Sequence, residues 1–333
     1  MIRYFGISGL LTFIAVAVVL FTLGFSSALT VIVLIAIEIA FSVDNAIINA
    51  KVLERLSHKW QQLFLTLGVV FAIVAMRLVF PVLIVVISAG LSWSEVVNEA
   101  LHNPSQYSAH LVAAHTTIAA YGGGFLLTLA LFFLLDEERK IVWLENIERP
   151  LQKLGGNIWL TPLIALIVVF FTGLGSDAVP AEVWRPGVLG IASYLTIKLV
   201  IDGLDKLAPQ ENKIYTGWSA FLAFMYLQLL DASFSLDGVL GAFAITSKIL
   251  LIVLGLGVGA AWVRSLTVYL VRRKTLNSYI YLEHGAHYAI LFLAIALMSS
   301  LLFDVPDAVT GIAGLGIIAA SFIASRQALL NKR

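Results

Sequence analysis

Cysteine is absent from the 333-residue sequence, and charged residues are scarce. Without cysteine the protein forms no disulfide, no thiolate metal site and no cysteine nucleophile. Asp, Glu, Lys and Arg together make up 12% of the chain, whereas a soluble domain carries roughly 25%. The formal net charge is +1, which gives no basis for nucleic acid as a partner. The composition therefore excludes thiol chemistry and disfavours both a soluble domain and a nucleic-acid-binding protein.

Hydrophobic residues, in contrast, make up 60% of the chain, and the mean hydropathy is +0.96. A membrane-spanning helix needs about 20 mostly apolar residues. The sequence therefore predicts an all-α, polytopic helical membrane protein. We expect the first apolar run to be a retained span, because it is longer than the roughly 7–15 residues of a signal-peptide core. The ten predicted spans lie near 4–24, 28–50, 63–89, 111–135, 160–176, 186–204, 217–246, 249–271, 283–303 and 308–328.

The basic residues predict the orientation of these spans. Lys and Arg accumulate in cytoplasmic loops, and with both termini in the cytoplasm the outside loops hold only Arg185 and Lys248. We therefore expect both termini on the cytoplasmic side, in a bacterial inner (plasma) membrane. The longest polar stretch, 136–158, is then an amphipathic cytoplasmic connector, and its simplest interpretation is a solvated linker.

Two hydrophobic segments carry the same acidic motif. Residues 37–47 read IEIAFSVDNAI, and residues 230–240 read LDASFSLDGVL. Both follow the pattern [DE]-x-x-F-S-[VL]-D-[NG], within apolar surroundings. A charged side chain at the centre of a span costs about 2.5–3.5 kcal/mol on insertion scales, so a doubled acidic motif requires an explanation.

A second pair of segments supports an internal repeat. Residues 67–77 and 254–264 each place Leu-Gly nine residues before an arginine, Arg77 or Arg264. Five spans in each half would reverse the direction of the second half, as in inverted-repeat transporters. The sequence therefore predicts a first repeat over 1–176, which includes the connector, and a second, inverted repeat over 177–333.

The motif residues offer a set of oxygen ligands for a metal cation. Carboxylates, an amide and hydroxyls suit Mn²⁺, Mg²⁺ or Ca²⁺ better than Zn²⁺ or Cu⁺. Four carboxylates with two balancing arginines, Arg77 and Arg264, leave an excess of negative charge that matches one divalent ion. The candidate metal ligands are Glu38, Ser42, Asp44, Asn45, Asp231, Ser235 and Asp237.

Helical geometry limits how the first motif could bind one ion. Ser42 and Asn45 each fall within about 40° of Glu38 on an ideal helix, whereas Asp44 lies roughly 120° from Glu38. Either the FSVD segment is broken, which we favour, or Asp44 faces another partner such as an arginine. A purely structural role, in which the acids pair with the arginines to fix helix register, is the alternative.

Other residues carry weaker signals. Glu283 and His287 are four residues apart on one predicted helix face, where they could relay protons. The consecutive glycines 122–124 indicate close helix packing. The segment GLGSD at 173–177 approaches a protease motif, but Ser176 interrupts it, so no enzymatic activity and no organic cofactor are expected.

The doubled motif resembles that of the TerC-type integral membrane proteins, the tellurium-resistance family, and in particular a longer branch of unassigned function. IEIAFSVDN and LDASFSLDG match its two acidic motifs, with Gly238 standing where the first motif has Asn45. The long loop expected near 90–110 also departs from the compact family form. The resemblance implies an inverted-repeat transporter fold and transport of a divalent cation, most often manganese export. By motif match, the cation would rest on Glu38, Asp44, Asn45, Asp231 and Asp237.

The expected function is therefore export of a divalent cation, with Mn²⁺ favoured, through a mid-membrane carboxylate site. The expected partners are the lipid bilayer, the metal ion and protons that the same carboxylates exchange. The alternative is a membrane scaffold or metallation partner that binds metal without net transport.

Overall fold

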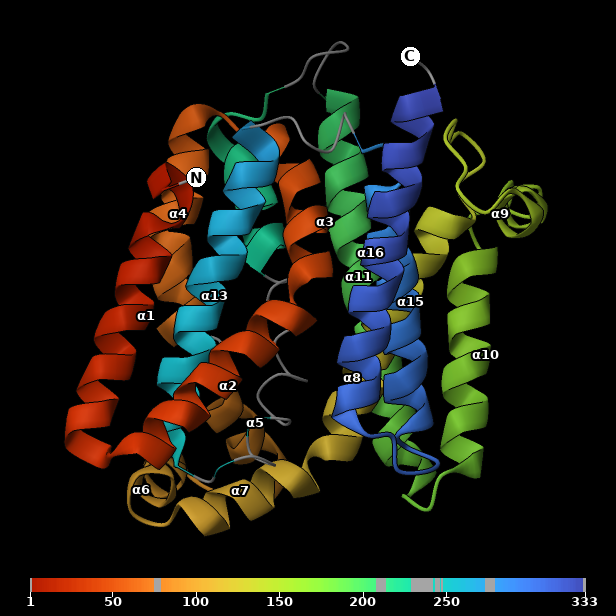
Figure 1. Ribbon diagram of the computed structural model, residues 1–333. Helices are drawn as coiled ribbons and strands as arrows, with labels where there is room; N and C mark the ends of the chain where they lie inside the picture. Colours follow the sequence, from red (N-terminus) through yellow and green to blue (C-terminus); the bar gives the residue numbers. More distant parts are fainter. Residues whose placement is uncertain are drawn as a thin grey trace. The chain divides into compact units, whose positions relative to one another are not determined.

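The computed structural model describes residues 2–74, 79–207, 214–228, 242, 246, 248–272 and 279–331, and most of these residues are helical (Figure 1). Residues 217–228 are also helical. Among the described residues, the only β-structure is an isolated bridge between Leu56 and Tyr215. The helices are α1 (Ile2–Leu23), α2 (Phe25–Phe41), α3 (Val43–Glu54), α4 (His58–Val74), α5 (Phe80–Ala89), α6 (Trp93–His102), α7 (Pro104–Ala113), α8 (His115–Leu134), α9 (Glu145–Gln152), α10 (Leu160–Gly175), α11 (Pro180–Leu207), α13 (Ile249–Arg272), α15 (Leu282–Ser299) and α16 (Asp307–Asn331).

Five helices in the described part of the chain are long and apolar enough to cross a membrane. A sixth candidate is the bent pair Phe25–Ala40 and Val43–Glu54. These agree with six of the predicted spans, and the all-α, membrane-helix character of the chain is confirmed. The count of ten and the inverted repeats remain predictions. The five helices are Tyr4–Leu23, His115–Leu134, Ile249–Arg272, Leu282–Ser299 and Ile312–Leu330.

Four predicted spans have a different outcome. The expected span 63–89 falls on α4 and α5, and 75–78 lie outside the described residues. The span 160–176 corresponds to α10, an apolar helix of 16 residues. The span 186–204 lies within α11, which is not among the candidate spans of the described chain. The span 217–246 is described as a helix over 217–228, and most of its remainder lies outside the described residues.

The chain divides into two compact units, each of which combines pieces from both halves of the sequence. Unit 1 consists of Met1–His115 and Ile214–Arg273, and unit 2 of Thr116–Lys213 and Lys274–Arg333. These units are defined by contacts between residues and not by similarity between the two halves of the sequence. They therefore do not test the predicted repeats, 1–176 and 177–333. The division places α2, α3, α4, α13 and the helix 217–228 in the same unit.

Helix α13 is the centre of unit 1, because α1, α2, α3 and α4 all pack against it. Its glycines permit this close packing. A Cβ on Gly255 would lie 2.5 Å from Leu34 Cβ, and a Cβ on Gly259 would lie 2.5 Å from Glu38 Cβ. Small residues at helix interfaces let backbones approach in this way. The glycine face of α13 therefore positions α2 at the level of Glu38.

The segment near 90–110, expected to be a loop, contains the helices α6 and α7, which pack against α5. A capping box begins α6: Ser92 Oγ accepts from the Glu95 N–H, and the Ser92 N–H donates to Glu95. The hydrogen bonds from Ser92 hold the pKa of Glu95 below its usual value. Reciprocal caps of this kind satisfy backbone groups that would otherwise lack partners, so this segment is ordered helix.

Close backbone packing also builds unit 2, as the glycines 122–124 predict. A Cβ on Gly124 would lie 2.5 Å from the carbonyl oxygen of Gly187, and one on Gly123 would lie 2.7 Å from Met298 Cε. These contacts join α8 to α11 and α15, while α15 packs against α16 and α10 against α11. The prediction of close packing by these glycines is confirmed.

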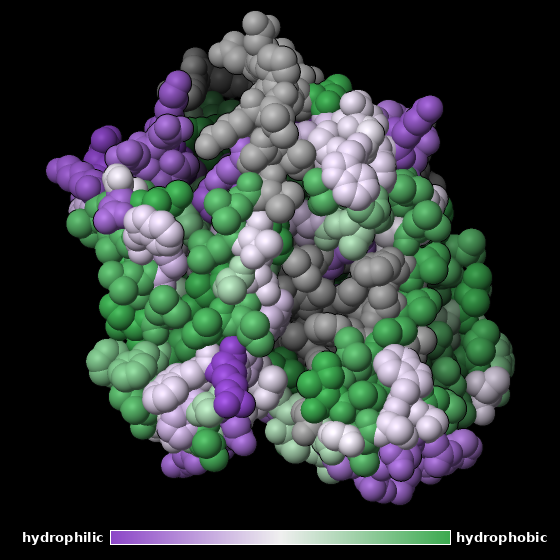
Figure 2. Space-filling model, turned by 180° about the vertical axis from the view of Figure 1, so that it is seen from behind, coloured by the Kyte–Doolittle hydropathy of each residue, from purple (hydrophilic) through white to green (hydrophobic). Residues whose placement is uncertain are grey.

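Large hydrophobic side chains are exposed on helices of both units. On the face shown in Figure 2, hydrophobic residues cover much of the middle, and hydrophilic ones gather towards the upper and lower ends. Phe13 and Phe21 of α1 are 73% and 87% exposed, and Ile312 of α16 is 72% exposed. Soluble monomers rarely leave such large apolar areas uncovered, so these surfaces match the membrane character of the composition.

Candidate functional site

The first acidic motif lies at a break between two helices. Helix α2 ends at Phe41, α3 begins at Val43, and the two are bent by 52° (Figure 1). Ser42 stands at the break, where its N–H donates to the Glu38 carbonyl and its own carbonyl accepts from the Ala46 N–H. The break that helical geometry led us to expect in FSVD is therefore present.

Four polar side chains are buried around this break: Glu38, Ser42, Asp44 and Asn45. Ser42 Oγ donates to Glu38 Oε1 over 3.2 Å, and the Asn45 N–H donates to Asp44 Oδ1 over 2.9 Å. Asp44 lies in the first turn of α3, where the helix dipole favours a negative charge. The first motif is thus a buried cluster of oxygen atoms that includes two carboxyl groups.

Asn49 belongs to the same polar stripe, although the sequence analysis did not single it out. It is buried in α3, one turn beyond Asn45. Asn45 and Asn49 are four residues apart, the spacing that places two side chains on one helix face. The spacing of Asn45 and Asn49 could have identified Asn49 as a candidate site residue from the sequence, because amide side chains are uncommon in an apolar span.

Arg264 is buried in α13 and contacts two other helices of unit 1. Its guanidinium donates to the Phe64 carbonyl and to Gln228 Oε1, each over 3.3 Å, and lies 4.4 Å from the centre of the Phe64 ring. A Cβ on Gly68 would lie 2.6 Å from Arg264 Nη1. Arg264 therefore occupies a space that α4 leaves open at a glycine. Its pairing with the motif carboxylates remains a prediction.

The rest of the predicted site is not described. Asp231, Ser235, Asp237 and Arg77 lie outside the described residues. Within the described ranges, no three His, Asp or Glu side chains come together in a group that could hold a metal ion. A cation site with more than the two carboxylates of the first motif would need residues outside the described ranges, such as those of the second motif, so the full ligand set remains a prediction.

The predicted relay pair, Glu283 and His287, lies at the start of α15. His287 Nδ1–H donates to the backbone carbonyl of Glu283 over 2.8 Å. The His287 ring also stacks on Phe133, with ring centres 3.6 Å apart. The described contact between the two residues thus uses the main chain of Glu283, and proton relay remains a prediction.

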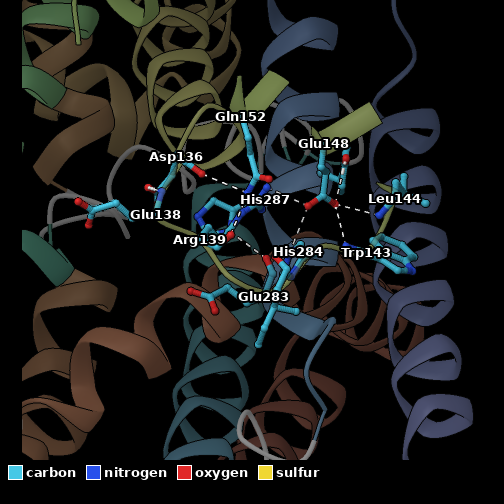
Figure 3. A network of polar contacts seen from close by, with 12 residues as sticks. Asp136, Glu138, Arg139, Trp143, Leu144, Glu148, Gln152, Glu283, His284 and His287 are labelled. Carbon is cyan, nitrogen blue, oxygen red and sulfur yellow. Dashed lines mark hydrogen bonds and ion pairs between the residues drawn. The ribbon is translucent and has the colours of Figure 1, made fainter. Parts of the chain in front are cut away.

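The connector 136–158, whose simplest interpretation was a solvated linker, is instead folded within unit 2 around a buried carboxylate (Figure 3). Glu148 of α9 is fully buried. Its Oε1 accepts from the N–H groups of Trp143 and Leu144, and its Oε2 lies 2.8 Å from Arg139 Nη2. The linker interpretation is therefore wrong for this part of the connector.

Helix α15 supplies the other side of this network. The Tyr288 hydroxyl donates to Glu148 Oε1 over 3.3 Å, and His284 Nε2 lies 3.5 Å from Glu148 Oε2. His284 Nε2–H also donates to the Ile141 carbonyl over 2.9 Å, and Arg139 lies over the Phe133 ring. The sequence pattern did not predict this network, because its partners come from segments far apart in the chain.

The fold and composition define a helical membrane protein, and its family can be named. Residues 43–333 match the family described as "Protein of unknown function (DUF475)". Because the match covers most of the chain, the protein belongs to that family. No curated protein and no solved structure matches the chain.

Proposed function

We propose that this protein transports a divalent metal cation, with Mn²⁺ favoured, out of the cytoplasm through the bacterial inner membrane. The observation that carries the proposal is the buried oxygen cluster of Glu38, Ser42, Asp44 and Asn45 at the break between α2 and α3. The resemblance of both motifs to those of TerC-type proteins points to the same function. In this proposal Asp231, Ser235 and Asp237 complete the ligand set.

Charge and ligand chemistry both support a cation at the break. Burying a carboxylate costs free energy unless a positive charge or hydrogen bonds compensate it. Around the motif acids, the Ser42 hydroxyl donates to Glu38 and the Asn45 N–H donates to Asp44. Carboxylate, amide and hydroxyl oxygens are the ligands of hard divalent cations. A transported cation would offset the buried negative charge each time it binds.

The packing of unit 1 supports an inverted-repeat arrangement. The first motif helix, α2, packs against α13, which belongs to the second half of the sequence. The helix 217–228, which leads towards the second motif, contacts α4 of the first half through the ring pairs Trp60–Phe221 and Trp60–Phe224. The helix that carries the first motif thus contacts α13, and the helix 217–228 contacts α4, which carries Leu67 and Gly68. Contacts between the two halves of the sequence are what a pair of interlocked repeats requires.

In this mechanism the break at Ser42 lets Glu38 and Asp44 approach one ion, which an unbroken helix would prevent. Discontinuous helices form the ion sites of many secondary transporters. Release of the cation would leave carboxylates that take up protons, which gives the protein a means of exchanging metal for protons. Arg264 would hold α4 and the helix 217–228 together on one side of this site.

The test is a flux assay with purified protein in liposomes, in which Mn²⁺, Mg²⁺, Ca²⁺ and Zn²⁺ are compared. We expect protein-dependent Mn²⁺ flux that exceeds the flux of the other three ions, because the resemblance to TerC-type proteins favours Mn²⁺ and the motif offers hard oxygen ligands without His or Cys. The lack of protein-dependent flux of any of the four ions would contradict the proposal. Protein-free liposomes measure the leak.

A further inference from the structure

Helix α9 buries a carboxylate while an aliphatic side chain beside it is exposed. Glu148 is fully buried, whereas Ile147 is 50% exposed and Leu144, which directly precedes the helix, is 37% exposed. On a water-facing surface the charged member of such a pair is normally the exposed one. The exposed aliphatic side chains at and around α9 therefore need a neighbour other than water.

The Glu148 network fixes which way these side chains face. Because Glu148 is held by the ion pair with Arg139 and by the Tyr288 hydroxyl, α9 has a defined rotation relative to α15. On an ideal helix Leu144, Ile147 and Leu151 fall within about 60° of one another, and Asn146 and Arg149 lie on the opposite side. Helix α9 thus has one side turned into the protein, one aliphatic flank and one polar face.

The aliphatic flank continues along the chain to the apolar helix α10. Leu154, Ile158 and Trp159 are 56%, 59% and 74% exposed in the segment between the two helices. The exposed side chains of α10 are themselves apolar, and Phe171 among them is 64% exposed. In Figure 1 α9 is seen nearly along its axis and α10 from the side, so the two helices run across each other. A helix that lies across an apolar helix, with tryptophan at the junction, is the arrangement found at a membrane interface.

We propose that the connector from Ile141 to Trp159 lies in the interface of the lipid bilayer and inserts its exposed apolar side chains among the acyl chains. The exposed charges around it are of both signs: Asp136, Glu137 and Glu138 on one hand, Lys140 and Lys153 on the other. Glu145 and Arg149 neutralise each other in an exposed ion pair. The recognition is therefore apolar, and it does not depend on anionic lipid.

The absence of cysteine provides a clean test, because any single cysteine can be labelled. Ile147→Cys and Leu154→Cys carry a nitroxide on the aliphatic side, and Asn146→Cys and Arg149→Cys are matched controls on the polar face of the same helix. The labelled full-length protein is placed in phosphatidylcholine liposomes, with and without phosphatidylglycerol. Electron paramagnetic resonance then compares relaxation by oxygen, which concentrates in lipid, with relaxation by a water-soluble nickel chelate.

We expect oxygen to relax the labels at 147 and 154 several-fold more than the nickel chelate does, with the reverse order at 146 and 149. The pattern should be the same in both lipid mixtures. Strong relaxation by nickel at 147 and 154 would place this flank in water and overturn the proposal. Protection of both labels from both reagents would also overturn it, because another protein surface would then cover the flank.

Discussion

Glu148→Ala is expected to lower the free energy of unfolding by about 3–5 kcal/mol, the cost of leaving one member of a buried ion pair without its partner. The Arg139 side chain is 9% exposed and lies 2.8 Å from Glu148, so the substitution leaves a nearly buried guanidinium without this counter-charge. The Trp143 and Leu144 N–H groups also lose their acceptor. Denaturant titration of the purified protein in mild detergent measures the loss.

The control for this prediction is on the same helix. Glu145→Ala removes an exposed carboxylate paired with Arg149, and exposed pairs contribute about 0–1 kcal/mol. The double substitution Arg139→Met with Glu148→Leu should recover part of the stability, because it leaves no unpaired buried charge, although the Trp143 and Leu144 N–H groups still lack their acceptor. Equal losses for Glu148→Ala and Glu145→Ala would contradict the role assigned to the network.

Glu38→Gln is expected to reduce divalent-cation flux by at least 10–100-fold, since losing even an indirect contact at a metal site costs about that much. The substitution keeps the size of the side chain and its position against Gly259, but it removes a negative charge from the buried cluster. Ser42→Ala should have a smaller effect, because the carboxylate that accepts its hydrogen bond remains.

Asp202→Asn is the matched control for Glu38→Gln. Asp202 is an acidic residue of α11 that pairs with Lys198, and it takes no part in the proposed site. Divalent-cation flux through the Asp202→Asn variant should equal that through the wild type in liposomes that contain the same amount of protein. Wild-type flux in Glu38→Gln, or an equal loss in both variants, would show that Glu38 does not bind the cation.

The break in the first motif was predictable from the geometry of a single segment. Two acids about 120° apart on an ideal helix could share one ion only if the helix were broken, and Ser42 stands where α2 ends and α3 begins. The close packing of Gly122–Gly124 was predictable for the same reason, because a run of glycines has few other uses in a span.

The Glu148 network could not be predicted in this way. Glu148 is buried because Tyr288 and His284, about 140 residues further along the chain, come to lie beside it. Nothing in the residues around Glu148 distinguishes it from Glu145, which is exposed. The start of α6, by contrast, could have been predicted from the sequence. Ser92 and Glu95 have the spacing of a capping box, which is typical of a helix N-terminus, and the sequence analysis did not use it.

The most direct test of the proposed transport is Mn²⁺ uptake into liposomes by the wild type, Asp44→Asn and Asp237→Asn, each shown to be monodisperse and folded. Asp44 lies at the break between α2 and α3, and Asp237 is its counterpart in the second motif. The account predicts uptake by the wild type and its loss in both variants, because the two motifs contribute to one site. Absence of Mn²⁺ uptake by the folded wild type, or full uptake by either variant, would contradict it.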